Sequence, residues 1–74
     1  MPRSKARNMV TIPAAHGAIF VQKERQKKDG VWYHISFGTR SANVQLASWR
    51  SRSTAHERAT RIRRALHGKV LVSV

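Results

Sequence analysis

The sequence contains no cysteine and very few acidic residues. Without cysteine the chain can form neither a disulfide nor a thiolate zinc site, and it lacks the cross-links on which small secreted domains usually depend. Its acidic residues are Glu24, Asp29 and Glu57, so a catalytic pair of carboxylates is not expected. These two absences argue against a secreted disulfide scaffold and against carboxylate catalysis.

Long hydrophobic runs are also missing. No apolar stretch approaches the roughly 20 residues that span a bilayer, and the first residues lack the apolar segment of a signal peptide. We therefore expect no membrane contact and a cytoplasmic location, which would be the nucleoid for a DNA-binding protein.

The spacing of the histidines and serines does not indicate a reactive site. No two histidines are four residues apart, the spacing that places two metal ligands on one helix face. The serines and threonines between Ser48 and Thr54 have no acid and histidine in a recognisable relation to them. We predict that the protein is not an enzyme, has no cofactor or metal, and takes no small-molecule substrate.

Positive charge is what the sequence has in excess. The 15 lysines and arginines face three acidic residues, which gives a formal net charge of +12. A compact chain with this charge repels itself, and a polyanion relieves the repulsion when it binds and releases counterions. The composition therefore predicts a nucleic-acid partner, with double-stranded DNA favoured and RNA second.

The 74 residues are enough for one domain, which we place at residues 17–74 after a flexible basic arm at residues 1–16. The arm begins with MPRSKAR, which alternates basic with small or polar residues and has nothing with which to build a core. The later part of the arm, MVTIP, fits either an edge strand or a segment that lies over the core.

Three strands are predicted in the first half of the domain. Residues 18–23 are rich in β-branched and aromatic side chains, and residues 31–37 alternate between two faces. The dipeptide Asp29-Gly30 between them favours a hairpin turn. A third strand at residues 44–49 follows another turn, so the three strands form an antiparallel meander.

A helix follows the meander. The segment Thr54-Ala-His-Glu57 fits a capping box, so the helix is expected to begin at Thr54. Apolar residues then recur on one narrow stripe, and Gly68 supplies a left-handed stop, so that the helix ends near His67. The other faces of this helix are almost uniformly cationic.

Residues 69–74 alternate like a strand that either returns to the meander or offers its edge to another subunit. The second arrangement favours a homodimer through the C-terminal strand. The whole pattern predicts an α+β fold, β-β-β-α-β, in which a three- to four-stranded antiparallel sheet packs against one helix in the C-terminal half. The expected core combines residues of the strands and the helix, namely Ile19, Val21, Tyr33, Ile35, Leu46, Ala59, Ile62 and Leu66.

Candidate contacts to phosphate lie on the arm, the turns and the helix. Arg50 and Arg52 precede the expected helix start, where free amides and the helix dipole already favour an anion. The complete set of basic candidates is Arg3, Lys5, Arg7, Lys27, Lys28, Arg40, Arg50, Arg52, Arg61 and Arg64.

Aromatic and polar side chains of the sheet are a second candidate surface. Strand alternation predicts that Trp32, His34, Gln45 and Trp49 share the sheet face away from the helix. There they would approach a groove of duplex DNA or stack on single-stranded bases. The alternative is that either tryptophan packs under the arm or at a dimer interface.

The order of the elements resembles two protein families. The segments DGVWYHISF and STAHERA are similar to the arm-binding domains of tyrosine recombinases, in which the sheet enters the major groove. This resemblance covers residues 18–67 and implies that role for Trp32, His34, Gln45 and Arg40. The segments FVQK, DGVWYHI and SRSTAHERATRI resemble YegP-like small repeat proteins, several of which have two copies where this chain has one. A small, basic, single-domain protein without its own enzyme also resembles the products of phage and mobile-element accessory genes.

Three hypotheses for the function follow. The first is binding to double-stranded DNA, with phosphate contacts from the arm, the turns and the helix and with the sheet face toward a groove. The second is RNA binding, including a ribosome-associated role, with bases stacked on Trp32 and Trp49. The third is a protein-interaction or inhibitor module that adds its C-terminal strand to a sheet edge of an acidic host partner.

Overall fold

A computed structural model of the protein describes residues 8–74, which form one antiparallel sheet and one α-helix. The helix, α1 (Arg52–Ala65), lies between the last two strands in sequence, and a short 3-10 turn, η1 (Ala14–His16), follows the first. The predicted α+β class, with its helix in the C-terminal half, is confirmed. The first strand of the sheet precedes the predicted β-β-β-α-β order. The sheet has five strands, β1 (Met9–Pro13), β2 (Ala18–Gln26), β3 (Gly30–Gly38), β4 (Asn43–Trp49) and β5 (Lys69–Ser73).

The segment that precedes β2 belongs to the sheet. Strand order is β1-β5-β4-β3-β2, and β1 pairs with β5 along its whole length. The expected boundary between arm and domain at residue 16 is therefore too late, because β1 and η1 are part of the fold. Residues 1–7 of the expected arm lie outside the described residues.

The C-terminal strand returns to the meander, which is one of its two expected arrangements. β5 lies between β1 and β4, and it pairs with β4 at Ser73, opposite Asn43. Because β1 occupies one edge of β5, the homodimer expected through the edge of the C-terminal strand cannot use that edge. β1 and β5 form a separate two-stranded unit, which we call the terminal ribbon (residues 8–13 and 69–74).

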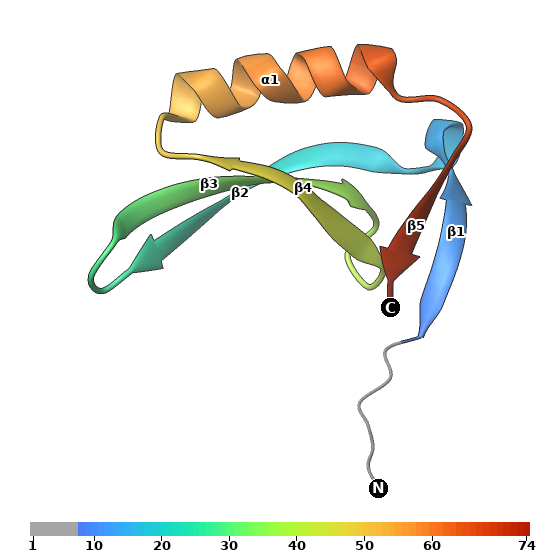
Figure 1. Ribbon diagram of the computed structural model, residues 1–74, viewed down its shortest axis with the longest axis horizontal. Helices are drawn as coiled ribbons and strands as arrows, with labels where there is room; N and C mark the ends of the chain where they lie inside the picture. Colours follow the sequence, from blue (N-terminus) through green and yellow to red (C-terminus); the bar gives the residue numbers. More distant parts are fainter. Residues whose placement is uncertain (1–7) are drawn as a thin grey trace, which may run out of the picture.

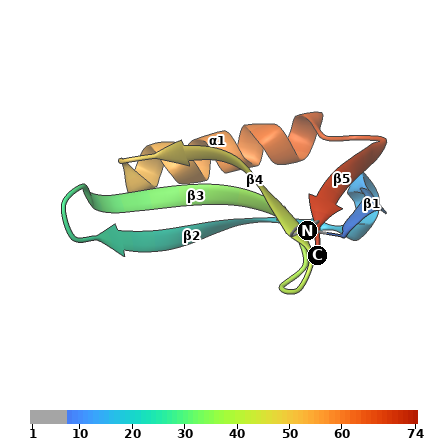
Figure 2. The same ribbon diagram turned by 60° about the horizontal axis from the view of Figure 1, so that its bottom comes forward.

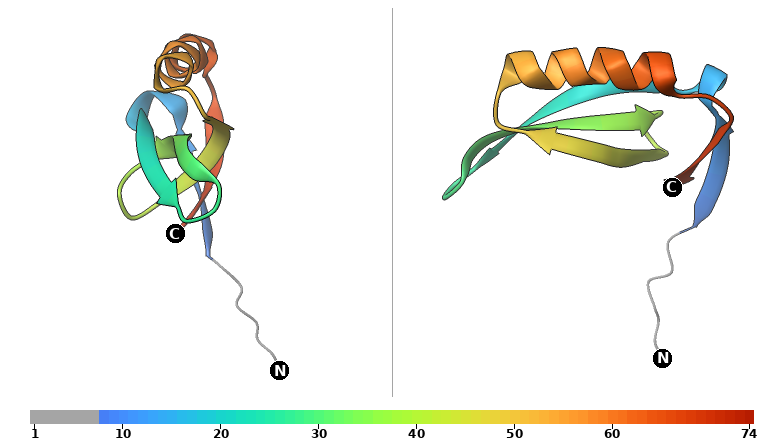
Figure 3. Two further views of the ribbon diagram at one scale, coloured as in Figure 1. Left: turned by 90° about the vertical axis from the view of Figure 1, so that its left-hand side faces the viewer. Right: turned by 45° about the horizontal axis from the view of Figure 1, so that its top comes forward.

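The helix covers one face of the β2–β3–β4 meander, and no element within residues 8–74 covers the other, which we call the uncovered face (Figures 1 and 2). At one end of the molecule the β2–β3 hairpin extends past the first turn of α1. At the other end the terminal ribbon crosses the molecule (Figures 1 and 3). The fold therefore has two distinct ends, joined by the meander and the helix.

The hairpin forms as its turn residues predict. β2 and β3 pair up to Gln26 opposite Gly30, with a three-residue turn between them. Gly30 has a φ of +80°, in the left-handed region that glycine adopts without steric cost. The turn expected from Asp29-Gly30 is confirmed, and Lys27 and Lys28 lie at its tip.

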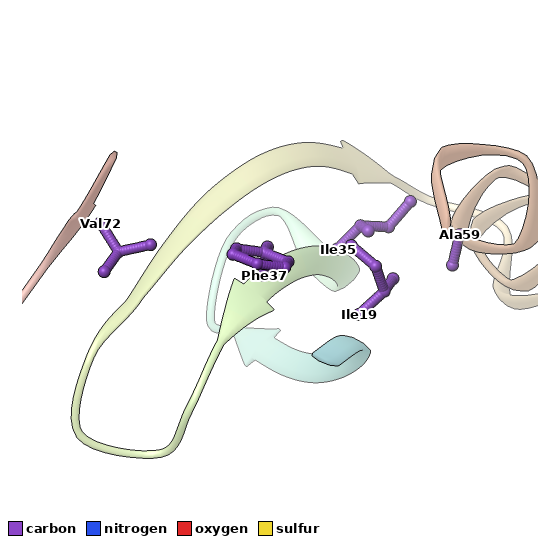
Figure 4. Packing of buried hydrophobic residues seen from close by; sticks show 5 residues of the cluster. All are labelled: Ile19, Ile35, Phe37, Ala59 and Val72. Atoms are coloured by element: carbon purple, nitrogen blue, oxygen red, sulfur yellow. The ribbon is translucent and has the colours of Figure 1, made fainter. Parts of the chain in front are cut away.

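The core lies between α1 and the meander and continues under the terminal ribbon. Phe37 lies between Val72 of the ribbon and Ile35 of the meander, so it connects the two parts (Figure 4). The buried residues of the core cluster are Ile19, Ile35, Phe37, Ala59 and Val72. The other predicted core residues of β2 and α1, Val21, Ile62 and Leu66, are half-buried against this cluster, and Tyr33 is half-buried as well.

A β-bulge makes the core prediction wrong for Leu46. The register of β3 against β4 shifts between Ile35 and Ser36, which leaves Leu46 as an extra residue in β4. Beyond the bulge the two faces of β4 exchange places. Ala47 and Trp49 therefore pack against the core, and Leu46 is exposed.

The helix begins earlier than predicted. Ser51 is the N-cap, and its hydroxyl accepts a hydrogen bond from the Thr54 amide at 3.3 Å. Glu57, the expected acid of the capping box, pairs with Arg61 one turn later at 3.6 Å. At the other end the helix stops at Ala65, before the predicted end near His67, and Leu66 in an extended conformation is its C-cap. Gly68, with a φ of +79°, lies in the turn to β5 and is not the helix cap.

Candidate nucleic-acid interface

Positive charge is distributed unevenly over the folded part of the chain. With the exception of Lys69, every lysine and arginine between residues 8 and 74 lies on the β2–β3 hairpin, on the turns on either side of β4, or on α1. This part of the chain has two ion pairs, which join the acids Glu24 and Glu57 to a histidine and an arginine. Most of the cationic side chains described are therefore not neutralised, whereas the terminal ribbon is almost uncharged.

One end of the molecule brings many of these side chains together. The β2–β3 hairpin, the junction between β4 and α1, and the first turns of α1 all lie at this end, with the tip of the hairpin projecting beyond the other two (Figures 1 and 3). We call this group the basic end. It consists of Lys23, Arg25, Lys27, Lys28, Arg50, Arg52 and His56.

Arg50 links the helix junction to the hairpin. Its guanidinium carbon lies 4.4 Å from the centroid of the Trp32 ring, in a cation–π contact. A guanidinium nitrogen of Arg50 also lies 3.5 Å from the point where a Cβ on Gly30 would be. Arg50 therefore covers one face of Trp32 and carries its charge to the base of the hairpin turn.

A cleft of about 480 Å³ lies at the basic end, between the hairpin and the start of α1. It is lined by Val21, Lys23, Tyr33, Arg52 and His56. Lys23 and Arg52 are cationic at neutral pH, His56 adds a further charge when protonated, and the Tyr33 hydroxyl is a hydrogen-bond donor. This combination of donors and charges suits a phosphate group.

Lys23 and His56 are absent from the set of candidates that the sequence indicates. Lys23 continues the alternation of Ile19 and Val21, so it lies on the face of β2 that the helix covers. His56 follows the buried Ala55 on α1. The alternation is visible in the sequence, but the approach of Lys23 to the helix depends on where α1 crosses the sheet.

The basic candidates of the sequence analysis fall into separate groups. Arg50 and Arg52 lie at the junction between β4 and α1, and Lys27 and Lys28 lie in the turn of the β2–β3 hairpin, so all four belong to the basic end. Arg40 lies beyond the opposite end of β3, a nine-residue strand that is roughly 30 Å long at about 3.3 Å per residue.

Other candidates lie on a different face or outside the described residues. At roughly 100° per residue, Arg61 and Arg64 lie on the side of α1 opposite Ala55 and Ala59, which are buried against the sheet. They therefore face away from the uncovered side of the sheet. The arm candidates Arg3, Lys5 and Arg7 fall within residues 1–7, which the structure does not describe.

The prediction for the exposed sheet face is wrong for Trp49. The bulge in β4 places Trp49 on the helix side, where it packs against the core. The guanidinium carbon of Arg58 lies 5.3 Å from its ring centroid, and its indole N–H is buried without a hydrogen-bond partner. A stacking platform that combines Trp49 with Trp32 is therefore not formed.

Polar side chains form a chain of hydrogen bonds on the uncovered face. Gln45 Nε2 donates to Ser48 Oγ at 3.1 Å, and Ser48 Oγ lies 2.6 Å from His34 Nδ1. His34 Nε2 lies 2.5 Å from Glu24 Oε1, which also accepts from Gln26 Nε2 at 3.3 Å. The hydrogen bonds from His34 and then Gln26 hold the pKa of Glu24 below its ordinary value of 4.5.

This chain joins a serine to a histidine and an acid, which the sequence did not indicate. In a catalytic triad the histidine Nε2 faces the serine and Nδ1 faces the acid. Here the arrangement is reversed, since Nδ1 of His34 faces Ser48 and Nε2 faces Glu24. Within residues 8–74, no three side chains of metal-binding type come together. The absence of enzymatic activity stays a prediction.

Comparisons of the chain with protein families, with curated proteins and with solved structures found no match. The resemblances to recombinase arm-binding domains and to YegP-like proteins therefore stay hypotheses. In the part of the chain that the structure describes, no helix has the length and apolar character needed to cross a membrane.

Proposed function

We propose that the protein binds double-stranded DNA through its basic end. The observation that supports this most strongly is the separation of charge between the hairpin, turns and helix on one side and the terminal ribbon, with Lys69 alone, on the other. A polyanion at the basic end relieves the repulsion among these cations, and the release of its counterions adds to the affinity.

The hairpin has dimensions that suit a DNA groove. A two-stranded β-ribbon fits the major groove of B-DNA, which is about 12 Å wide. The β2–β3 hairpin extends past α1, so the helix does not shield its tip (Figure 1). With the hairpin in the groove, Lys27 and Lys28 reach phosphates on the groove walls while polar side chains of the sheet approach the base edges.

The cleft beside the hairpin supplies a second group of phosphate contacts. Lys23 and Arg52 come from the sheet and the helix, respectively, and both line the cleft. A phosphate on the strand next to the inserted hairpin would be bound between them. His56 lines the same cleft, and a ring N–H would donate a further hydrogen bond to the phosphate.

The outer face of α1 offers a different arrangement. Arg61 and Arg64 face away from the sheet, so a straight duplex that contacts them cannot also lie against the uncovered sheet face. The two arrangements exclude each other on one duplex, although the sequence analysis combined them. We favour the basic end because it joins cations from the hairpin, the junction and the helix.

Fluorescence anisotropy with labelled duplex DNA, duplex RNA and single strands tests this proposal. We expect duplex DNA to bind best, with an affinity that falls steeply between about 50 and 300 mM salt. The log–log slope is about −0.9 per neutralised phosphate, so at least about four contacts should give a slope of −3.6 or steeper. The proposal would be contradicted if duplex RNA or single strands bound at least as tightly as duplex DNA, or if duplex DNA did not bind at about 150 mM salt.

RNA binding stays a second candidate because one tryptophan remains at the surface of the basic end. Arg50 covers one face of Trp32, so a base would have to displace it before stacking. For single-stranded RNA, Trp32→Ala should weaken binding far more than Arg52→Ala does. For duplex DNA, the arginine substitution should have the larger effect, because phosphate contacts dominate.

A further inference from the structure

The two outer strands of the sheet differ in how their free edges are protected. β2 carries Lys23 and Arg25 and leads into Lys27. Cationic side chains of this kind keep an edge strand from pairing with another chain. β1 has no charged side chain, so its free edge lacks this protection.

Exposed apolar side chains gather beside the unprotected edge. Lys69 is the one charged side chain of the terminal ribbon, although the chain has a net charge of +12. Among the described residues, the large apolar side chains that are exposed are Met9 (50%), Val10 (40%), Leu71 (56%) and Val74 (58%) on the ribbon, and Leu46 (38%) at the bulge of β4.

The hydrogen bonds at both ends of β1 establish which backbone groups face β5. The Val74 amide donates to the Asn8 carbonyl at 2.9 Å, and the Ala14 amide donates to the Gly68 carbonyl at 2.8 Å. Along an antiparallel strand, groups that bond to the neighbour alternate with groups that point away from it. The even-numbered residues of β1 therefore face β5.

The free edge of β1 consequently presents the backbone groups of Met9 and Thr11. Pro13 falls at the next outward position, where its missing N–H costs the sheet no hydrogen bond. This proline also limits any partner strand to the first part of β1. The edge can therefore pair over a short segment with one defined register.

We propose that two copies of the protein pair through this edge, as antiparallel strands around a two-fold axis at Val10. In this register Met9 of one copy lies opposite Thr11 of the other, and each such pair exchanges two backbone hydrogen bonds. Val10 then faces Val10 of the second copy. The same surface is used twice, as in other two-fold dimers.

The distribution of charge favours a second copy of the protein, and not an acidic partner, as the chain that pairs with the free edge of β1. A second copy carries the same net charge of +12, so the cations of the hairpin, the turns and α1 repel it. Among residues 8–74, the nearly neutral ribbon is the surface that repels it least. An acidic partner would instead be attracted to the cationic surfaces. The ribbon is also at the end opposite the hairpin, so pairing there keeps the two basic ends far apart (Figure 1).

Sedimentation equilibrium of the full chain without nucleic acid tests the dimer. Salt screens the repulsion between copies, so dimerisation should strengthen at least about tenfold between about 50 and 500 mM NaCl. DNA binding should change in the opposite direction. A wild-type protein that stays monomeric at about 500 mM NaCl would overturn the dimer, and it would leave the anisotropy test of DNA binding unaffected.

A pair of substitutions separates the edge from general surface charge. Val10→Lys places two like charges opposite each other at the two-fold axis, so it should abolish the dimer. Leu46→Lys adds the same charge at a side chain of similar exposure, 38% against 40% for Val10, and should leave the dimer intact. Equal effects of the two substitutions would contradict the proposed interface.

A mixing experiment tests whether loss of the dimer in Val10→Lys results from misfolding. Val10→Glu alone should also be monomeric, because two carboxylates face each other at the axis. An equimolar mixture of Val10→Lys and Val10→Glu should form a heterodimer, since opposite charges then meet. If both variants have wild-type circular dichroism and their mixture stays monomeric, the pairing at Val10 is wrong.

Discussion

The two ends of this molecule are built from one sheet, yet they differ in almost every surface property. The basic end consists of a hairpin and a helix start with unneutralised cations, and the helix leaves its tip uncovered. The terminal ribbon has one charged side chain, and its inner face supplies Val72 to the core. The difference shows that a strongly basic chain can keep one nearly neutral surface, because the cations of residues 8–74 other than Lys69 are confined to the hairpin, the turns and the helix.

The largest effect is expected from removing the side chain that connects the terminal ribbon to the meander. Phe37 is fully buried between the ribbon and the meander, so Phe37→Ala should lower the free energy of unfolding by about 3–5 kcal/mol. Urea denaturation followed by circular dichroism measures this loss. Phe20→Ala, a half-buried site on β2, should cost clearly less, and equal losses would show that Phe37 is not the link.

The next prediction compares the basic end with the helix face. Lys27→Ala/Lys28→Ala should weaken duplex DNA binding roughly tenfold and lower the salt slope by about two, because two phosphate contacts are lost. Anisotropy titrations at several salt concentrations give both quantities. Arg61→Ala/Arg64→Ala removes the same charge from the outer face of α1 and should have less effect.

The opposite ranking would move the interface to the helix. Lys69→Ala on the terminal ribbon is the reference for the loss of one cation far from the proposed contact. It should leave the slope unchanged, because no phosphate is contacted there. A decrease in slope with Lys69→Ala would mean that the ribbon end also binds DNA.

The third prediction compares two arginines that each contact a tryptophan ring, one at the basic end and one on the helix side. Arg50→Ala exposes Trp32 and removes one cation of the basic end, so it should lower DNA affinity and increase acrylamide quenching of tryptophan fluorescence. Arg58→Ala removes the same charge above Trp49 on the helix side. It should reduce DNA affinity less, and equal reductions would contradict a contact centred on the hairpin.

The smallest expected effect concerns pH and stability. The pKa of Glu24 is lowered in the folded state, so its contribution to stability is present above about pH 4.5 and is lost as the pH falls through the lowered pKa. The difference in urea midpoint between wild type and Glu24→Gln should therefore shrink between about pH 6 and about pH 3. A difference that stays constant over this range would mean that the hydrogen bond with His34 does not hold the carboxylate in solution.

Local signals in the sequence predicted the elements better than their contacts. Asp29-Gly30 specified the hairpin turn, because such a turn depends on the conformation of one or two residues. Gly68 suggested too late an end for the helix, because Leu66 is its C-cap. The helix start was misplaced because Ser51 and Thr54 are both good N-cap residues. Only the surrounding chain decides between them.

The α+β class, the meander, the apolar stripe of the helix and the excess of positive charge could be predicted from periodicity and composition, because neither depends on contacts between distant segments. The tertiary structure decided the rest. It turned Trp49 to the helix side through a bulge that depends on the partner strand, and it brought Lys23 to Arg52 through the crossing of α1 over the sheet. It also made β1 an outer strand, because strand order is set by pairing between distant segments.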